Sequence, residues 1–288
     1  MPPMIQAELP HMAPSPGRAG CVPILKWCGG KRWLVPTIAP AIHRQLIKTG
    51  GRYVEPFLGG AAIALDLGLP YMILSDICQP LISMYRTICK TPAAVAWMVQ
   101  HLIAQGTDEA AYYALRATPS TSPVVNAARF LYLNKLGYNG LYRENRTGGF
   151  NVPYGKNPTR RLPTIEDLLP VAQALAHATI TATGFAATIA QARRGDVVYA
   201  DPPYYATFSD YAADGFDDDA HVALAAALHA AAGRGATIIA SNSDHPRIRE
   251  LYAWACITPL HEHHAIGPTK AQRGKKAAVL ICSDEIYL

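Results

Sequence analysis

The sequence contains no long apolar segment and relatively few charged residues. No uninterrupted apolar run approaches the roughly 18 residues that a membrane-spanning helix needs, so we expect no transmembrane segment. The first 20 residues have no apolar stretch after a basic start; we expect no secretory signal there and interpret them as a proline-rich, disordered tail. Charged residues make up 16% of the 288 residues and hydrophobic residues 50%, which excludes a mainly disordered chain and predicts a large buried core.

The sequence also lacks the cysteine and histidine spacings that are typical of metal sites. Its six cysteines contain no C-x-x-C pair, which argues against a disulfide framework or a zinc knuckle and favours the reducing cytoplasm. His261 and His263 would share one face of a strand, but no third ligand stands at a recognisable spacing, so we expect no metal. The net charge of +5 permits a polyanionic partner without requiring one.

Apolar periodicity predicts an α/β chain with a mostly helical middle. The strands are expected at 52–57, 71–76, 179–184, 196–200, 237–241, 253–259 and 277–283, and the helices at 33–48, 81–90, 92–105, 108–115, 123–135, 165–176, 185–192 and 219–232. The first two strands and the Gly-rich turn and helix between them form one βαβ unit. We therefore expect, after the tail of residues 1–20, an α/β domain of residues 21–85 and 165–288 that is split by a helical insert of residues 86–164.

The motif Asp201-Pro202-Pro203-Tyr204 directly follows the predicted strand 196–200. It would lie at the carboxyl end of a parallel strand, where open α/β sheets bind ligands. Two prolines stiffen the turn, so a carboxylate and a fixed carbonyl can accept both protons of an exocyclic NH₂ group and draw its lone pair out of conjugation. Tyr204 offers a flat surface on which a planar base can stack. An ordinary Pro-Pro surface turn is the alternative.

A second motif, Glu55-Pro56-Phe57-Leu58-Gly59-Gly60, follows the first predicted strand. Glycines there let the backbone approach a ligand closely, but the spacing fits neither a dinucleotide fingerprint nor a P-loop. Asp76 ends the next strand and can accept hydrogen bonds from a ribose diol, or alternatively cap a helix. These features together predict a nucleoside cofactor without a pyrophosphate. In the segment from Lys26 to Lys31, tandem glycines between lysines can bring an ammonium group to a carboxylate or phosphate.

Residues 137–155 are dense in Gly, Asn, Tyr and Arg, which predicts a hairpin or an ordered loop. Such side chains on a turn-rich element are suited to contacting base edges and to wedging into a base stack. Two groups of basic residues can bind phosphates, although solvated basic loops are the alternative: Arg146, Lys156, Arg160 and Arg161, and then Lys270, Arg273, Lys275 and Lys276.

These motifs in this order resemble the Dam-type (D12 class) site-specific DNA adenine N6-methyltransferases over about residues 24–283. The family's opening L-K-W-x-G-G-K stands here as Leu25–Lys31, its cofactor turn as Glu55–Gly59, its target-recognition hairpin as Tyr138–Gly155 and its D-P-P-Y as Asp201–Tyr204. The family carries a glycine where this chain has Ala61, and we expect Gly60 to supply the backbone freedom instead.

The resemblance implies a Rossmann-like S-adenosylmethionine-dependent methyltransferase sheet with an inserted, mostly helical target-recognition domain that carries a β-hairpin. It implies three sets of site residues. The catalytic residues would be Asp201, Pro202 and Tyr204. The cofactor-binding residues would be Trp27, Lys31, Glu55, Phe57, Gly59, Asp76 and Asp201. The DNA-binding residues would be Lys26, Tyr138, Asn139, Leu141, Arg143, Asn151 and Pro153.

The implied activity is methylation of the adenine exocyclic amine in duplex DNA after base flipping, at the sequence GATC, by an orphan or restriction–modification enzyme. We expect S-adenosylmethionine as the cofactor, double-stranded DNA as the partner, and a monomer that needs no metal and no membrane. None of the six cysteines stands in a motif suited to covalent attack on a ring carbon. Two alternatives are an RNA or protein amide N-methyltransferase and a catalytically inactive DNA-binding protein.

Overall fold

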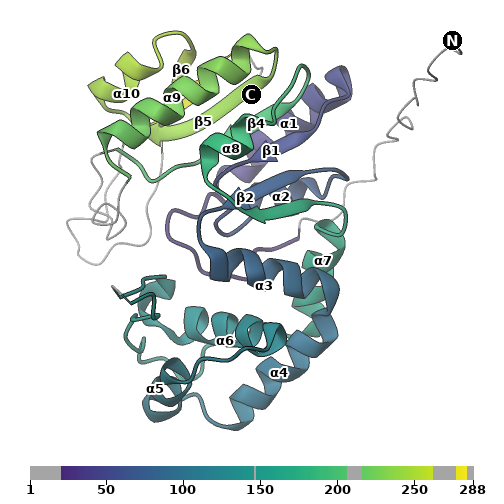
Figure 1. The fold of residues 1–288 in the computed structure, drawn as a ribbon, viewed down its shortest axis with the longest axis vertical. Helices are drawn as coiled ribbons and strands as arrows, with labels where there is room; N and C mark the ends of the chain where they lie inside the picture. The colour runs from purple at the N-terminus through teal and green to yellow at the C-terminus, as the bar shows by residue number, and fades with distance from the viewer. Residues whose placement is uncertain (1–20, 146, 206–215, 262–276, 284–288) are drawn as a thin grey trace, which may run out of the picture.

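The computed structural model describes residues 21–145, 147–205, 216–261 and 277–283, and these form a sheet-containing lobe and a helical lobe (Figure 1). The predicted tail of residues 1–20, Arg146, His263 and the basic run from Lys270 to Lys276 lie outside the described residues. No helix in the described ranges is long and apolar enough to span a membrane.

The larger lobe is built on a seven-stranded sheet with the order β3-β2-β1-β4-β5-β7-β6. Its strands are β1 (Tyr53–Glu55), β2 (Ile73–Asp76), β3 (Thr179–Ala182), β4 (Val197–Ala200), β5 (Thr237–Ser243), β6 (Cys256–His261) and β7 (Ala277–Cys282). The first five strands are parallel, and β7 is antiparallel to both β5 and β6. The predicted α/β class is confirmed, and the last two strands of the chain pair with each other. The strand order reverses between β1 and β4. Open α/β sheets bind ligands at such a reversal, so we expect a ligand site at this point.

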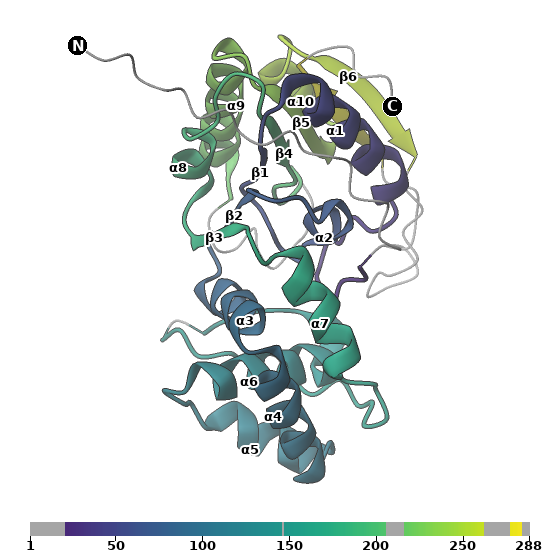
Figure 2. The same cartoon turned by 90° about the vertical axis from the view of Figure 1, so that its right-hand side faces the viewer.

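Helices cover both faces of the sheet (Figure 2). Those of the sheet lobe are α1 (Val35–Thr49), α2 (Ala62–Leu67), α8 (Phe185–Ile189), α9 (Asp218–Gly233) and α10 (Pro246–Leu251), of which only α10 was not predicted. Strand side chains alternate between two cores, because successive residues point to opposite faces. In β4, for example, Val197 and Tyr199 pack on the α1 and α2 side, whereas Val198 and Ala200 pack against α8 and α9.

The helical lobe consists of α3 (Gln79–Lys90), α4 (Pro92–Ala104), α5 (Glu109–Ala117), α6 (Pro123–Leu136) and α7 (Ile165–Ala174). The predicted boundary at residue 86 falls inside α3, which contacts β2 and β3 as well as α6. One apolar cluster therefore runs from the sheet through α3 into the helical lobe. The short 3₁₀ helix η1 (Tyr138–Gly140) follows α6.

The loop after α6 is less regular than the predicted β-hairpin. In the described part of residues 137–155, two isolated antiparallel bridges, Gly137 with Tyr154 and Glu144 with Phe150, stand in place of a continuous ladder. Side-chain bonds supply the remaining order: the Asn145 carboxamide oxygen accepts from the backbone N–H groups of Thr147 and Gly149 at 3.0 and 2.8 Å. Bonds of this kind compete with a strand ladder, so the segment folds as a closed loop.

A buried ion pair joins the amino ends of the two central strands. Asp196, which is fully buried, accepts hydrogen bonds from the Arg52 backbone N–H at 2.8 Å, from Arg52 Nη2 at 2.6 Å and from the Arg193 backbone N–H at 3.1 Å. Because Arg52 precedes β1 and Asp196 precedes β4, these contacts fix how the two strands start beside each other.

We predict that Asp196→Ala lowers the free energy of unfolding by about 3–5 kcal/mol, because it leaves a partly buried guanidinium and two backbone donors without their acceptor. Arg249→Ala is the matched control. It breaks the ion pair of Arg249 with Asp244, which is more exposed, and should cost about 1 kcal/mol or less. Denaturant unfolding measures both variants, and equal losses would contradict the anchoring role of Asp196.

Candidate functional site

The two sharpest sequence motifs meet the opening segment at the carboxyl edge of β1 and β4. Lys31, which is 6% exposed, lies just before α1. Its Nζ is 2.9 Å from Asp201 Oδ1, and it donates to the Gly29 carbonyl at 2.9 Å. The same ammonium group lies 4.4 Å from the centre of the Tyr204 ring. The first and last residues of the D-P-P-Y motif are thus both held by one cation.

The Asp201 carboxylate has a second donor from the neighbouring strand. Ser241 Oγ, at the carboxyl end of β5, donates to Asp201 Oδ1 at 2.7 Å. The strand register explains this contact, because Ala200 pairs with Ala240. The residues that follow them, Asp201 and Ser241, therefore lie side by side. Lys31 and Ser241 therefore both donate to the same oxygen of this carboxylate.

The end of β5 also fixes the residue after the motif. Asn242 Oδ1 accepts from the Tyr205 backbone N–H at 2.9 Å, and Ser243 Oγ donates to the Tyr205 carbonyl at 2.8 Å. The sequence prediction missed these residues because it ended the strand at Ser241. A run of Ser, Asn and Ser at the carboxyl end of the strand beside D-P-P-Y is the signal that points to them.

Two further carboxyl groups lie at the ends of β1 and β2. Glu55 is 3% exposed, and its Oε2 has no hydrogen-bond partner among the described residues. Burial raises the pKa of Glu55 well above its usual value, and the negative charges of Asp201 and Asp76 act in the same direction, while the Tyr53 hydroxyl and the Ala64 amide oppose the shift. A buried carboxyl with a spare oxygen is suited to a cationic or hydrogen-bond-donating ligand group.

Asp76 holds the glycine turn after β1. Its Oδ2 accepts from the Gly59 N–H and its Oδ1 from the Cys78 N–H, both at 2.9 Å. Burial raises the pKa of Asp76, and these backbone donors partly oppose the shift. The N-cap of α3 is Cys78 rather than Asp76. The carboxylate is thus tied to the turn, and each of its oxygens keeps a further lone pair for a ligand.

The glycine turn after β1 contains one residue with an unexpected backbone conformation, and Trp27 packs against it. Ala61, not Gly60, takes a left-handed conformation, with φ 57°, beside Gly59 at φ 45°. The expectation that Gly60 supplies this freedom is therefore wrong. A side chain on Gly59 would lie 2.9 Å from the Trp27 ring, so the indole packs directly on the turn. Phe57 instead stacks with Phe185 on the opposite side of the sheet, at 5.6 Å between ring centres.

The opening segment continues into the helical lobe. The Trp27 ring stacks with Phe130 of α6 and with Tyr142, at 6.3 and 6.0 Å between ring centres. One residue earlier, the Lys26 backbone N–H donates to Asn134 Oδ1 at 3.0 Å, and Asn134 Nδ2 donates to the Lys26 carbonyl at 2.8 Å. Burial lowers the pKa of the Lys26 ammonium, and the nearby Arg160 acts in the same direction.

The structure pairs several of the predicted DNA-binding residues in the loop after α6. Tyr138, which is 44% exposed, donates its backbone N–H to the Pro153 carbonyl at 2.8 Å. The exposed Arg143 donates through Nε to Asn151 Oδ1 at 2.7 Å. Asn139 takes a left-handed conformation with φ 53°, and the Leu141 N–H closes the turn on the Tyr138 carbonyl. Aromatic and guanidinium groups are thus presented on one ordered loop.

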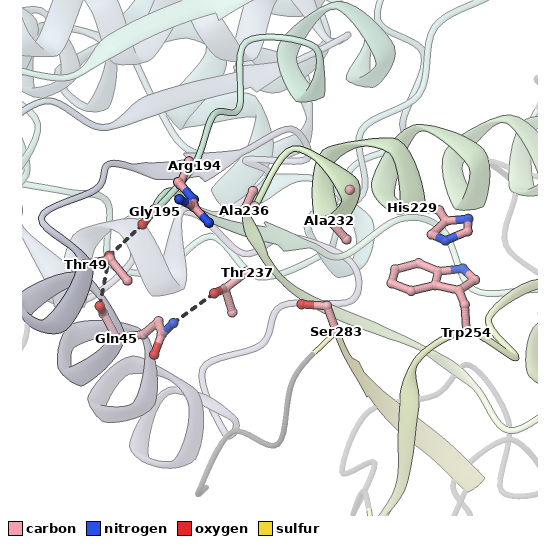
Figure 3. Close-up of a pocket in the computed structure, with 12 residues that line it drawn as sticks. Gln45, Thr49, Arg194, Gly195, His229, Ala232, Ala236, Thr237, Trp254 and Ser283 are labelled. Atoms are coloured by element: carbon pink, nitrogen blue, oxygen red, sulfur yellow. Dashed lines mark hydrogen bonds between the residues drawn. The ribbon is translucent and has the colours of Figure 1, made fainter.

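A cavity lies away from these residues. It measures about 600 Å³ and lies at the amino ends of β4 and β5, where Thr49 bonds to the Gly195 carbonyl and Gln45 to Thr237 (Figure 3). None of the predicted site residues lines it. A second cavity of about 360 Å³ lies between α3 and α6 and is lined in part by Phe130 and Tyr142. In the described ranges no group of three or more His, Cys, Asp or Glu could hold a metal.

Comparisons with known proteins identify the family to which the chain is similar. Residues 27–266 match the model of a family described as D12 class N6 adenine-specific DNA methyltransferase. A retron Ec67 DNA adenine methylase from Escherichia coli is 36% identical over 80% of this chain and 80% of its own. A DNA adenine methylase from Vibrio cholerae is 32% identical over 87% of this chain and 92% of its own.

Two further matches are more distant. A type II methyltransferase, M1.LlaDCHI, from Lactococcus lactis is 28% identical over 90% of this chain and 94% of its own. Among solved structures, an rRNA methyltransferase from Streptomyces viridochromogenes covers 87% of this chain and 85% of its own at 17% identity. Its TM-score of 0.34 is too low to support a functional comparison.

Proposed function

This chain belongs to the D12 class N6 adenine-specific DNA methyltransferases, and from this membership we propose that it uses S-adenosylmethionine to methylate adenine N6 in duplex DNA at GATC sites. The observation that carries the proposal is the Asp201 carboxylate at the carboxyl end of β4, where Lys31 and Ser241 both bond to Oδ1. We assign catalysis to residues 21–85 and 165–288 and target recognition to residues 86–164, with α3 and α7 in contact with both lobes.

The D-P-P-Y residues polarise and hold the target amine. Asp201 accepts one hydrogen of the N6 amine and the Pro202 carbonyl accepts the other, so that the nitrogen lone pair leaves conjugation and points at the methyl donor. Tyr204 supplies the face on which the flipped base stacks. When bound, S-adenosylmethionine would supply a methyl carbon on a cationic sulfur; the N6 lone pair would take up this methyl group, the C–S electron pair would stay on sulfur, and N6 would release one proton to water. The protein mainly orients and polarises.

The residues around the β1 turn fit such a cofactor. The spare Oε2 of Glu55 and the Lys31 ammonium can hold the ammonium and carboxylate groups of its amino-acid end. Asp76 can accept from the ribose diol while its bonds to Gly59 and Cys78 keep the carboxylate oriented. Gly59 keeps the turn free of side chains beneath Trp27. Phe57 lies on the other side of the sheet from Glu55 and can contribute only from there.

The loop after α6 supplies the groups for reading DNA. The exposed Arg143, held by Asn151, can present its guanidinium fork to a guanine edge in the major groove. The exposed Tyr138 ring can enter the gap that a flipped adenine leaves. Lys26, Asn139, Leu141 and Pro153 stand at the other reading positions that the family resemblance implies.

We predict that Asp201→Ala lowers kcat on the order of 10²–10³-fold, which is the scale for losing a placed electrostatic group in an active site. The affinity for DNA should persist, because the loop after α6 and the basic residues carry it. Transfer of tritium from labelled S-adenosylmethionine to duplex DNA measures the first quantity, and equilibrium binding to labelled DNA measures the second. Near-normal turnover in this variant would remove the proposed role of Asp201.

For the target site, DNA treated with the protein and S-adenosylmethionine should resist a nuclease that GATC adenine methylation blocks. Arg143→Ala should relax discrimination at one guanine, by about 1–3 kcal/mol. Arg161→Ala, a control that removes a mostly exposed basic side chain, should weaken binding to all sequences alike. Full cleavage, together with methyladenine in another sequence context, would reject GATC while leaving the chemistry intact.

A further inference from the structure

Three consecutive polar residues end β5 beside the D-P-P-Y motif. Ser241 is fully buried and bonds to the Asp201 side chain, while Asn242 and Ser243 bond to the two backbone polar groups of Tyr205. The turn from Asp201 to Tyr205 is therefore held at both of its ends by the neighbouring strand. Of these three residues, only Ser241 contacts a group that the proposed chemistry uses.

The Ser241 hydroxyl bonds to one particular oxygen of the Asp201 carboxylate. Its bond of 2.7 Å goes to Oδ1, the same oxygen that Lys31 contacts at 2.9 Å. A carboxylate whose Oδ1 is fixed by two donors cannot rotate freely about its terminal bond, so Oδ2 keeps one direction. Oδ2 is the oxygen that neither of these two bonds uses.

The two donors differ in how firmly they are held. Lys31 lies on a segment outside the sheet, between the exposed Gly30 and the start of α1, and its ammonium has a flexible stem. Ser241 has a single side-chain torsion and belongs to a strand that is paired on both sides, with β4 and with β7. Of the two, Ser241 is the donor whose position the fold itself determines.

We propose that Ser241 is a positioning residue for methyl transfer, orienting Asp201 so that Oδ2 accepts the hydrogen bond of the target amine. The inference rests on the proposed function, and it assigns Ser241 no contact with substrate. It requires that removal of the hydroxyl affects turnover rather than binding, and that the effect passes through Asp201.

Ser241→Ala and Ser241→Thr test the inference, with Thr237→Val as a matched control. Thr237 is a buried hydroxyl residue at the amino end of the same strand, and its Oγ1 accepts a hydrogen bond from Gln45 Nε2 at 2.9 Å, away from Asp201. Tritium transfer to duplex DNA gives kcat and KM, equilibrium binding gives the affinities for S-adenosylmethionine and DNA, and thermal unfolding shows whether each variant is folded.

Ser241→Ala should lower kcat by about 10- to 100-fold, the range for losing a partner that orients a reacting group, with KM and both binding affinities close to the wild-type values. Ser241→Thr, which keeps the hydroxyl, and Thr237→Val should both retain kcat. In an Asp201→Ala background the Ser241→Ala change should have no further effect, because a residue that acts through Asp201 has nothing left to orient.

An unchanged kcat in Ser241→Ala, or an equal fall in Thr237→Val, would overturn the inference. So would an additive loss in the double variant, which would mean that Ser241 acts independently of Asp201. Each of these results leaves the proposed function standing, provided that the wild-type protein methylates DNA. A wild-type protein that transfers no methyl group to DNA would instead reject the proposed function and the role of Ser241 with it.

Discussion

The parallel pairing of β1 with β4 is the constraint on which the site depends. Glu55 and Asp201 are far apart in the sequence, yet the register of Val54 with Val198 brings the carboxyl ends of their strands to one edge of the sheet. The buried pair of Arg52 and Asp196 fixes the opposite, amino ends of the same strands. Because strand side chains alternate between faces, Asp201 and Ser241 each follow a residue of the α8 and α9 core and turn toward the other side. There they meet Lys31. A slip of one residue between these strands would separate all of these groups.

The opening segment connects three parts of the molecule within six residues. Lys26 bonds to Asn134 of α6, Trp27 packs on the Gly59 turn and against Tyr142 of the loop after α6, and Lys31 contacts Asp201. The proposed cofactor turn, target-amine site and DNA-reading loop are thus all in contact with one short stretch of chain. Membership in an adenine-specific DNA methyltransferase family gives this arrangement a reason, since the reaction must bring a cofactor, a base and a DNA sequence to one place. The same family membership disfavours the two alternatives, an RNA or protein amide N-methyltransferase and a catalytically inactive DNA-binding protein.

Sequence patterns could predict the strand-end motifs, because carboxyl ends of parallel strands must lie together and D-P-P-Y, E-P-F and Asp76 each follow a strongly apolar run. They could not predict which residue of Gly59-Gly60-Ala61 takes a left-handed conformation, since packing under Trp27 decides it. The boundary at residue 86 cuts α3 because an amphipathic pattern does not say that both lobes share the helix. Asn242 and Ser243 were missed because a polar run has the composition of a turn, although here it extends β5, and Ser241 was predicted only as the end of the strand. The pairing of Arg143 with Asn151 needs the folded loop.

The most direct test of the account supplies the purified protein with methyl-labelled S-adenosylmethionine and, in parallel, duplex DNA, RNA and a protein mixture. The recovered nucleosides and amino acids are then separated by chromatography and identified by mass. The geometry of Asp201, Pro202 and Tyr204, in a chain of this family, predicts label in N6-methyladenine from duplex DNA and little in the other two substrates. Label in RNA or in protein amides, or label in DNA at a cytosine, would contradict the assignment of adenine N6 as the target.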